Sequence, residues 1–521
     1  MLKFVRGVAI LCAFAGFVRA LQAHQDKWVQ VTSPHFTVVS NSGAGDARRI
    51  AAQCEIVREV FQEDFPNLRV DGGSPLIVIA VKDEDSLKVL LPDFFADKNR
   101  THPNGMFDSG VDESFMTLRT DLRVNGNDNP YSGLYEEYVY SVLRLNYSAM
   151  PLWLRTGIAM YYGNTIVDGN YTDVGRPTQA EVVTLQRSQL IPLTDLMAAD
   201  QRSPFYNERD QSQIFFVESW VLVHYLTLDP QAAKQDYLTK YMKAFEGSDD
   251  GLEAAQQTFG DLNQLQSKIY DYARRMTFYT QRRPSIAKQS DDYKESEMSP
   301  AEALTVEADF LEHTHHVSQA REMLQQAASM QPDLAAIHDC LGFDDFAQHQ
   351  NEAAQTEFEK AFKSNPQDYR ALYYLAQIAY RDAGYNPQSV DLMRQDLETV
   401  VQINPNFAPA WAFLSVVYLH DPATRQKALD AALKAHQLLP AAVGYVVEAG
   451  NALIALNRDA DARALSKTIE AMATTPQEKS MAEAYANRLS MYEQRTGQSQ
   501  QAADPGAAGG TQAAPGTQQP H

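Results

Sequence analysis

The chain has 521 residues, which is long enough for roughly two to four domains with sizeable hydrophobic cores. Its formal net charge is −21, with 45 Lys and Arg residues against 66 Asp and Glu residues. This acidic balance argues against DNA, RNA or an anionic membrane surface as a binding partner.

Residues 1–23 have the pattern of a secretory signal. Lys3 and Arg6 give a basic start, an apolar run of about 12 residues follows, and small residues stand at Ala20 and Ala23. The run is too short to cross a bilayer, and no later segment approaches about 18 apolar residues. We therefore expect an exported bacterial protein, periplasmic or extracellular, with no membrane span in the mature chain and with cleavage after Ala20 or Ala23.

Two cysteines remain after the signal segment, Cys54 and Cys340, and they fall in different predicted domains. A disulfide between them is possible in an exported protein. We expect two buried thiols instead, because the two residues belong to separate cores.

The segment 24–280 is predicted to be one α+β domain. Short apolar stretches with alternating polarity indicate strands, and apolar residues three and four positions apart indicate helices. In chain order, the expected elements are two strands within 28–41 that turn at Ser33 and Pro34, a helix at 44–65, a strand at 75–81, a short helix at 86–91, a strand at 114–119 and a helical lobe at about 178–280.

Residues 135–162 contain the most informative motif of the chain. Glutamates at 136 and 137 precede a Pro-x-Trp-Leu run that begins at Pro151. The stretch resembles the zinc-binding core of the peptidase MA-like, gluzincin-type metallopeptidase domains of secreted bacterial proteins, whose pattern is H-E-Y-x-H followed by P-x-W-L-N-E-G-x-A-E-Y. The residues that match this pattern are Glu137, Tyr138, Pro151, Trp153, Leu154, Gly157, Ala159 and Tyr161.

All three zinc ligands of that pattern are replaced. In such enzymes two histidines at i and i+4 and a downstream glutamate bind the zinc, and the glutamate beside the first histidine is the general base. Here Glu136 and Tyr140 stand at the histidine positions, and Thr156 stands at the third ligand position. Glu137 keeps the general-base position without a metal-bound water to act on. We therefore expect no bound metal, no cofactor and no activity from this site.

Further residues extend the resemblance to about 28–280. Met160 replaces the second acidic residue, and Phe216 stands where the related helix at 214–226 has a tyrosine. His224, on the same apolar helix, is expected to be a hydrogen-bonded core histidine. The resemblance implies a zincin-like fold in which an edge strand lines the substrate cleft, and the strand at 114–119 is expected to be that edge.

Residues 281–299 are polar and aperiodic, so we expect a linker, and from residue 300 the pattern changes to repeated helical pairs. Prolines at 332, 366, 405 and 440 are spaced 34, 39 and 35 residues apart, close to the 34-residue period of tetratricopeptide repeats. Four repeats to residue 440 and a degenerate fifth pair predict an all-α solenoid over 300–490. Its small and large core positions are expected at Ala320, Leu324, Ala327, Ala354, Phe358 and Ala361, and its first-helix signature at Trp411, Leu414, Ser415 and Tyr418, with His338 at the tryptophan position of an earlier repeat.

Other residues of the repeat region are weaker candidates. Three histidines, His313, His315 and His316, are expected to lie in a solvated turn, and the tail 491–521 is expected to be disordered. Tyr373, Tyr374, Tyr380 and Arg381 are candidates for a concave peptide-binding surface, although core packing is the commoner explanation of their helical spacing.

The sequence thus favours an exported, inactive metallopeptidase-like protein that binds protein or peptide partners through its repeats. One alternative is an active hydrolase with an atypical or displaced metal site. The adjacent carboxylates of Glu136 and Glu137 diverge by about 100° on a helix, which weakens a paired-acid mechanism. The other alternative is a plain repeat scaffold that the N-terminal domain only caps.

Overall fold

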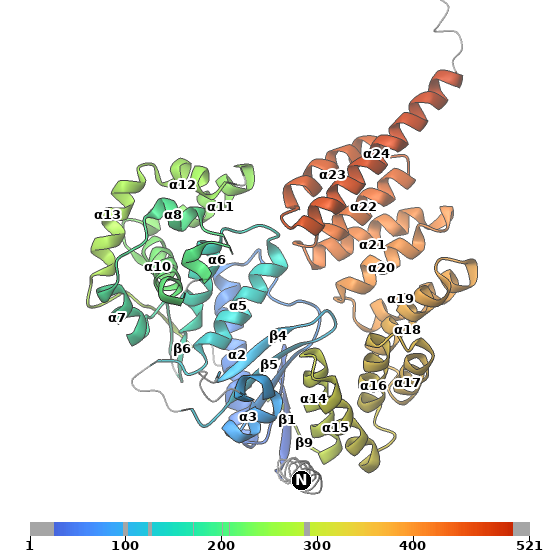
Figure 1. Ribbon diagram of the computed structural model, residues 1–521, viewed down its shortest axis with the longest axis horizontal. Helices are drawn as coiled ribbons and strands as arrows, with labels where there is room; N and C mark the ends of the chain where they lie inside the picture. Colours follow the sequence, from blue (N-terminus) through green and yellow to red (C-terminus); the bar gives the residue numbers. More distant parts are fainter. Residues whose placement is uncertain are drawn as a thin grey trace, which may run out of the picture.

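A computed structural model describes residues 26–96, 103–122, 128–169, 171–200, 202–207, 209–248, 250–285 and 292–503. The predicted signal segment 1–23 lies outside these residues. Figure 1 shows a sheet in blue between a helical lobe in green and an array of helical pairs coloured yellow to red.

The main sheet has six strands in the order β4-β5-β3-β2-β1-β9. The three adjacent strands β2, β3 and β5 run parallel, whereas β1, β4 and β9 pair antiparallel to their neighbours. The strands predicted within 28–41, at 75–81 and at 114–119 are confirmed. Their bounds are β1 (Trp28–Thr32), β2 (Phe36–Ser40), β3 (Leu76–Val81), β4 (Gly105–Ser109), β5 (Ser114–Arg119) and β9 (Lys294–Met298).

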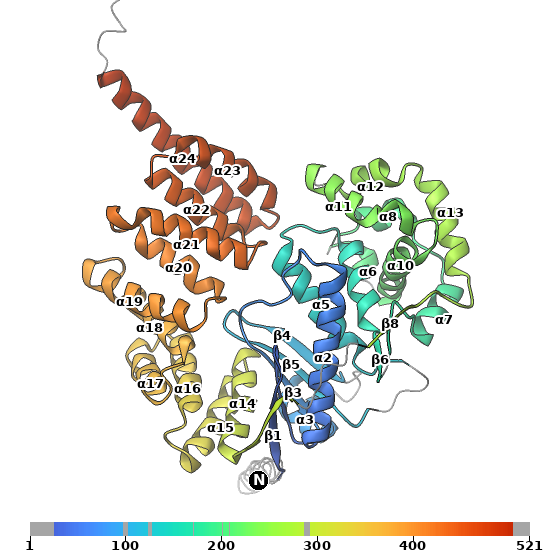
Figure 2. The ribbon, with the colours of Figure 1, turned by 180° about the vertical axis from the view of Figure 1, so that it is seen from behind.

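Apolar side chains alternate along the strands and give the sheet two buried faces. On one face, Val31, Val38 and Val78 pack in the core that also contains α2 (Ala44–Asp64) and α5 (Ser132–Asn146). Figure 2 shows α2 crossing this face. On the opposite face, Trp28, Val39, Ile79 and Phe115 pack against α3 (Glu84–Leu90) and against Ala303 and Phe310 of α14 (Pro300–His313). The first helix of the repeat array is therefore part of the core beneath the sheet.

The prediction that residues 114–119 form an edge strand is wrong. Residues Ser114–Arg119 form β5, which is paired on both sides, and the edge strand beside it is β4. A turn was expected at Gly105, Met106 and Phe107, before the strand at 114–119, but these residues begin β4. Gly105 instead allows a close approach between strands: a Cβ at this position would lie 1.9 Å from the carbonyl oxygen of Thr117.

The segment expected to be a linker contains two strands. One is β8 (Gln281–Pro284), which joins β6 (Ile166–Asp168) and β7 (Tyr171–Val174) in a small antiparallel sheet. The other is β9, which pairs with β1 at the edge of the main sheet. Because an edge strand leaves most side chains in solvent, its sequence can be as polar as that of a loop.

The helical lobe packs beside the sheet on α6 (Leu152–Gly163) and α10 (Arg209–Leu228). It agrees with the predicted lobe at 178–280. Its other helices are α7 (Gln179–Arg187), α8 (Leu193–Ala198), α9 (Pro204–Asn207), α11 (Tyr237–Ser248), α12 (Gly251–Phe259) and α13 (Leu262–Ala273).

The repeat region is a solenoid of antiparallel helical pairs, as predicted. Each predicted proline follows the second helix of a pair by two residues, and the expected core positions such as Leu324 and Phe358 are fully buried. The helices after α14 are α15 (Val317–Met330), α16 (Ala335–Ala347), α17 (Asn351–Ser364), α18 (Tyr369–Ala383), α19 (Pro387–Ile403), α20 (Ala408–Tyr418), α21 (Arg425–Leu438), α22 (Val443–Ala455) and α23 (Asp459–Met472).

His338 takes over one contact of the tryptophan that it replaces. The indole Nε1 of Trp411 donates a hydrogen bond to the carbonyl of Pro405 at 2.9 Å. In the earlier repeat, Nε2 of His338 donates to the carbonyl of Pro332, also at 2.9 Å. Both contacts tie a first helix to the turn before it, so the departure from the repeat pattern is conservative.

Two further predictions for this region need correction. The tail was expected to be disordered from residue 491, but α24 (Pro476–Ala503) continues as a helix past this point, consistent with its Gln and Ala content; residues 504–521 lie outside the described chain. His313 ends α14 and is buried, so only His315 and His316 belong to the turn.

Candidate functional site

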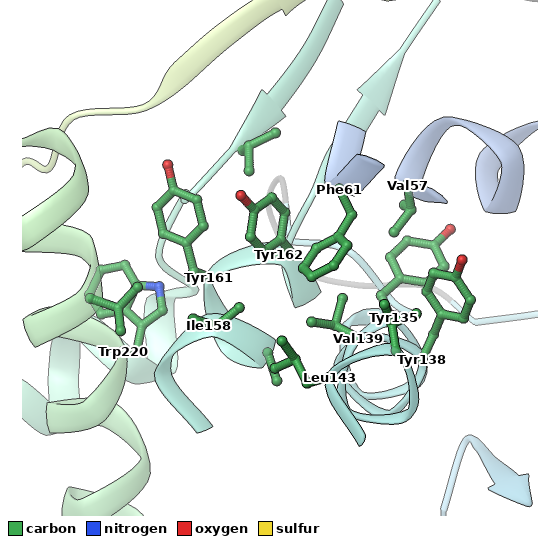
Figure 3. Packing of buried hydrophobic residues seen from close by; sticks show 14 of the residues in the cluster. Val57, Phe61, Tyr135, Tyr138, Val139, Leu143, Ile158, Tyr161, Tyr162 and Trp220 are labelled. Atoms are coloured by element: carbon green, nitrogen blue, oxygen red, sulfur yellow. The ribbon is translucent and has the colours of Figure 1, made fainter. Parts of the chain in front are cut away.

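Helices α5, α6 and α10 place the residues of the metallopeptidase-like motif. Gly157 of α6 lies against the backbone of α10, where a Cβ would come within 2.3 Å of the carbonyl oxygen of Ser219. The indole of Trp153 is fully buried and donates to the hydroxyl of Tyr241 at 3.1 Å. Gly157 thus brings α6 close to α10, and Trp153 joins α6 to α11. Figure 3 shows the packed layer between α5 and α6, with Val139, Leu143, Ile158, Tyr161 and Tyr162.

A cavity of about 530 Å³ opens between these helices. All three degenerate ligand positions, Glu136, Tyr140 and Thr156, lie in its wall together with Glu137. The structure therefore brings together residues that the sequence separates by up to 20 positions. The cavity is lined by Glu136, Glu137, Tyr140, Arg144, Arg155, Thr156, Met160, Ala180, Glu181, Thr184, Tyr206, Gln213, Phe216 and Val217.

Two of the residues that align with zinc ligands in the metallopeptidase pattern, Tyr140 and Thr156, are bonded to each other. The hydroxyl of Tyr140 donates to Oγ1 of Thr156 at 2.7 Å, and Thr156 is fully buried. Burial raises the pKa of the Tyr140 phenol above its ordinary value, so it stays neutral. In the part of the chain that the structure describes, no three His, Cys, Asp or Glu side chains of this cavity bring ligand atoms within 4.8 Å of one another.

Glu136 lies close to a second acidic residue, Glu181, which was not predicted to be part of the site. Burial, with the negative charges of Glu181 and Glu137, raises the pKa of Glu136 to about 8. Burial also raises the pKa of Glu181 to about 7, although its carboxylate accepts from the Thr178 amide at 2.6 Å. The side chain of Glu136 packs over Gly163, where a Cβ would lie 2.3 Å from its Cγ.

The sequence did contain a signal for Glu181. Thr178 and Glu181 form a capping box at the start of α7, in which the Glu181 amide also donates to the Thr178 hydroxyl at 3.2 Å. The spacing T-x-x-E is the known signature of this motif. It could have placed Glu181 at a helix terminus, but its position beside Glu136 depends on how the lobe folds back on α5.

Glu136 gives the protein a testable pH dependence. A raised folded-state pKa means that the folded protein holds a proton that the unfolded chain has lost, so stability falls as pH rises from the ordinary carboxyl range to about 8. We expect Glu136→Gln to be more stabilising at about pH 9 than at about pH 5, by about 1–2 kcal/mol. Urea denaturation at both values measures this difference. The exposed Glu322 provides the control, since Glu322→Gln should show no such difference; equal effects of Glu136→Gln at both pH values would refute the assignment.

Basic and aromatic residues complete the cavity. The Arg155 guanidinium lies 5.8 Å from the centre of the Tyr140 ring, and its Nε has no hydrogen-bond partner among the described residues. The ring of Tyr206 packs against that of Phe216 at a centroid distance of 5.7 Å. Both residues line the cavity, and Tyr206 adds a phenol to its wall. The cavity thus offers both acidic and basic groups to a ligand.

A second cavity of about 700 Å³ lies beside the first, and Arg144 lines both. Its walls come from β4 with Phe107 and Ser109, from α5 with Tyr138, and from the turn of the solenoid at Asn404 and Asn406. Asn404 donates to the carbonyl of Gly73 at 2.9 Å, which fixes the solenoid against this side of the domain. The edge strand therefore faces a cleft that the two halves of the chain build together.

The loop between β4 and β5 packs on the inner face of the solenoid. There its two acidic residues contact Arg370 of α18. Arg370 lies 3.1 Å from Asp112 and 2.7 Å from Glu113 of the loop. It also lies 3.3 Å from Asp309 of α14 and 3.3 Å from Asp339 of α16. The N-terminal domain thus occupies part of the face where a peptide partner was expected.

The predicted peptide-binding residues are mostly engaged within the chain. Tyr373 and Tyr374 are 7% exposed, and the Tyr374 hydroxyl donates to Asp112 at 3.1 Å. The Arg381 guanidinium stacks 3.5 Å from the centre of the Phe346 ring. Tyr380 is 42% exposed, and Arg381 is exposed as well. Tyr373 and Tyr374 are core residues, and the docked loop contacts Tyr374 through Asp112.

Two sequence predictions about buried residues are confirmed. His224 is fully buried, with its Nδ1 2.9 Å from the Tyr272 hydroxyl and its Nε2 3.0 Å from the Tyr279 carbonyl oxygen. Burial lowers the pKa of His224 to about 4, so the ring is neutral. Cys54 and Cys340 are both buried free thiols.

Among the described residues, no helix combines the length and apolar composition needed to cross a bilayer.

Comparison with known proteins gives matches to solved structures but to no protein family. No family model matches the chain, and no curated protein matches it. The C-terminal half is a tetratricopeptide-type solenoid. Its helical pairs and its proline period show this directly. The solved structures are similar only at low TM-scores.

Three of these structures are similar to between 35% and 40% of the chain. PilF of Pseudomonas aeruginosa is 17% identical, with 40% of this chain and 92% of that chain covered and a TM-score of 0.31. YrrB, a repeat protein described as having an unusual peptide-binding site, is 15% identical, with 35% and 92% covered and a TM-score of 0.30. MamA from Desulfovibrio magneticus RS-1 is 18% identical, with 37% and 96% covered and a TM-score of 0.27.

Proposed function

We propose that this chain is a metallopeptidase-like protein of the peptidase MA type that binds an extended peptide and does not cut it. One observation carries the proposal. The cavity that would hold zinc is present, but Tyr140 and Thr156 satisfy each other through a hydrogen bond of 2.7 Å at two of the three ligand positions. The proposal includes export of the protein to the periplasm or the cell exterior, on the pattern of residues 1–23.

The chemistry of the cavity supports binding without catalysis. A catalytic zinc needs three ligands from imidazole, thiolate or carboxylate groups and a water in the fourth position. A neutral phenol and a hydroxyl do not supply two of these three. Glu137 keeps its place in the wall, but a general base needs an activated water within reach.

The edge strand β4 supports an extended ligand. It pairs with β5 on one side and has no strand partner on the other among the described residues. Because Met106 and Asp108 are in the pairs that bond to β5, the amide of Phe107 points to the open side. A peptide added there would gain main-chain hydrogen bonds, which require no metal. Its side chains would then reach the cavity that contains Arg144.

A second function has one specific observation in its favour. The docking of Asp112 and Glu113 on Arg370 leaves less of the inner face of the repeats open to a partner. In this alternative the N-terminal domain fixes the curvature of a scaffold, and partners bind the outer face or the later repeats.

Restoring the lost ligands tests whether the frame is that of a metallopeptidase. We expect the triple variant Glu136→His, Tyr140→His and Thr156→Glu to gain one zinc per chain relative to the wild type, measured by elemental analysis after dialysis against a weak chelator. The control keeps Tyr140 and changes only the other two positions; without the second histidine it should gain much less zinc. A folded triple variant with no gain would contradict the metallopeptidase-like assignment.

A further inference from the structure

The first two repeats contain a group of buried ligand atoms outside the cavity described above. Asp309 and Glu312 lie three residues apart on α14, and therefore on the same face of the helix. Cys340 faces them from α16, which packs on α14. One ligand atom from each of these three residues lies within 4.8 Å of the others, and all three residues are buried.

Glu312 has no partner that explains its burial. Its side chain is 4% exposed, and neither carboxylate oxygen has a hydrogen-bond partner among the described residues. A buried carboxyl group without a hydrogen-bond partner costs free energy, and a bound cation is one way to compensate for this cost.

The charges around this group favour a cation. Two buried positive groups, Arg370 and His313, face five carboxyl groups at the junction of the two domains. Arg370 lies within 3.3 Å of four of these carboxyl groups and His313 within 3.4 Å of two. Glu312 is not among the carboxyl groups that pair with Arg370 or His313. The five carboxyl groups are Asp112, Glu113, Asp309, Glu312 and Asp339.

We propose that Asp309, Glu312 and Cys340 form a structural binding site for one zinc ion between the first and second repeats. Zinc binds thiolate and carboxylate ligands together, whereas Mg²⁺ and Ca²⁺ take oxygen ligands. At bond lengths of about 2.0–2.3 Å, tetrahedral ligands stand about 3.3–3.8 Å apart, so a small contraction of the observed group is sufficient. The three side chains supply three donor atoms, and a water molecule would complete the four-coordinate shell.

The ion would act as a clamp beside the domain junction. It would join α14, which packs under the sheet, to α16, whose Asp339 contacts Arg370. Facing helices of bundles commonly provide metal ligands in this way, including pairs three residues apart. The site is independent of the proposed peptide cleft.

Cobalt is the probe for this site, because a cysteine ligand gives Co²⁺ a characteristic thiolate charge-transfer absorption in the near ultraviolet. The full-length protein is stripped with a chelator and titrated with Co²⁺ alone. We expect the absorption to saturate at one equivalent and to disappear when one equivalent of Zn²⁺ is added. Cys340→Ala should abolish the absorption, and Glu312→Gln, which keeps the side-chain size, should weaken Co²⁺ binding by at least about tenfold.

Two control variants localise the signal. Cys54→Ala removes the other buried thiol and should leave the absorption unchanged. Glu136→Gln alters the cavity of the N-terminal domain and should also leave it unchanged, so a failure of this proposal is distinguishable from a failure of the proposed function. No cobalt absorption in the wild type, or an absorption that persists in folded Cys340→Ala, would overturn the zinc site. If Cys340→Ala does not fold, unchanged cobalt affinity in Glu312→Gln has the same meaning.

Discussion

Replacing Arg370 with methionine is expected to lower the free energy of unfolding by about 3–5 kcal/mol. Its guanidinium is buried and lies within 3.3 Å of four carboxylates that come from the β4–β5 loop, α14 and α16. Without it, these carboxylates stay buried beside each other with too little positive charge. Removal of one partner from a buried ion network is costly for this reason, even where the intact network adds little.

Urea denaturation followed by tryptophan fluorescence measures this loss. Arg394→Met is the matched control, because Arg394 is an exposed arginine of the same solenoid that pairs with Asp391 at 2.9 Å. Exposed pairs of this kind contribute about 0.3–0.5 kcal/mol. If the two variants were equally stable, the loop would not be held by Arg370 and the two halves of the chain would not unfold as coupled units.

The second large effect is expected at Gly157, where α6 and α10 touch. Alanine is the better helix former by about 1 kcal/mol, so helix propensity alone predicts that Gly157→Ala stabilises the protein. The new Cβ would lie 2.3 Å from the Ser219 carbonyl oxygen and 2.5 Å from a methyl carbon of Val223. Since backbone cannot move away as a flexible side chain does, we expect a net loss of about 1–3 kcal/mol.

Gly133 of α5 provides the opposite result. No atom outside its own helix lies within 4 Å of a Cβ built at this residue, so Gly133→Ala should be neutral or stabilising by up to about 1 kcal/mol. Thermal unfolding of both variants gives the comparison. A stable Gly157→Ala protein would mean that the helices are farther apart than described, and with them the walls of the cavity at Thr156.

Sequence reasoning succeeded where local patterns determine the structure. The proline period and the small residues at positions such as Ala320 and Ala354 predicted the solenoid, because each repeat buries the same positions against its neighbours. The resemblance to the metallopeptidase pattern implied that Glu136, Tyr140 and Thr156 share one site, and all three line the same cavity. The solenoid depends on helical periodicity, which is visible in a single sequence.

It failed where tertiary contacts decide. The spacing of Tyr374 allowed either core packing or a peptide-binding surface, and only the fold shows that it contacts Asp112 of a loop 262 residues away in the sequence. The polar strand β9 satisfies its backbone at the edge of the sheet, so its composition resembles a loop. Cys340 and Glu312 come together only because α14 and α16 pack, and no spacing rule connects them.

The central claim is that the cleft beside β4 binds peptides and does not cleave them. The most direct measurement is mass spectrometry of a tryptic casein digest incubated with the immobilised full-length protein, in which retained and newly cleaved peptides are identified in one sample. Phe107→Pro, which removes the outward amide of β4 without touching a bond to β5, is the binding control. We predict that the wild type retains intact peptides, that Phe107→Pro retains fewer, and that Glu137→Gln behaves as the wild type. Cleavage products formed by the wild type and lost in Glu137→Gln would contradict the claim.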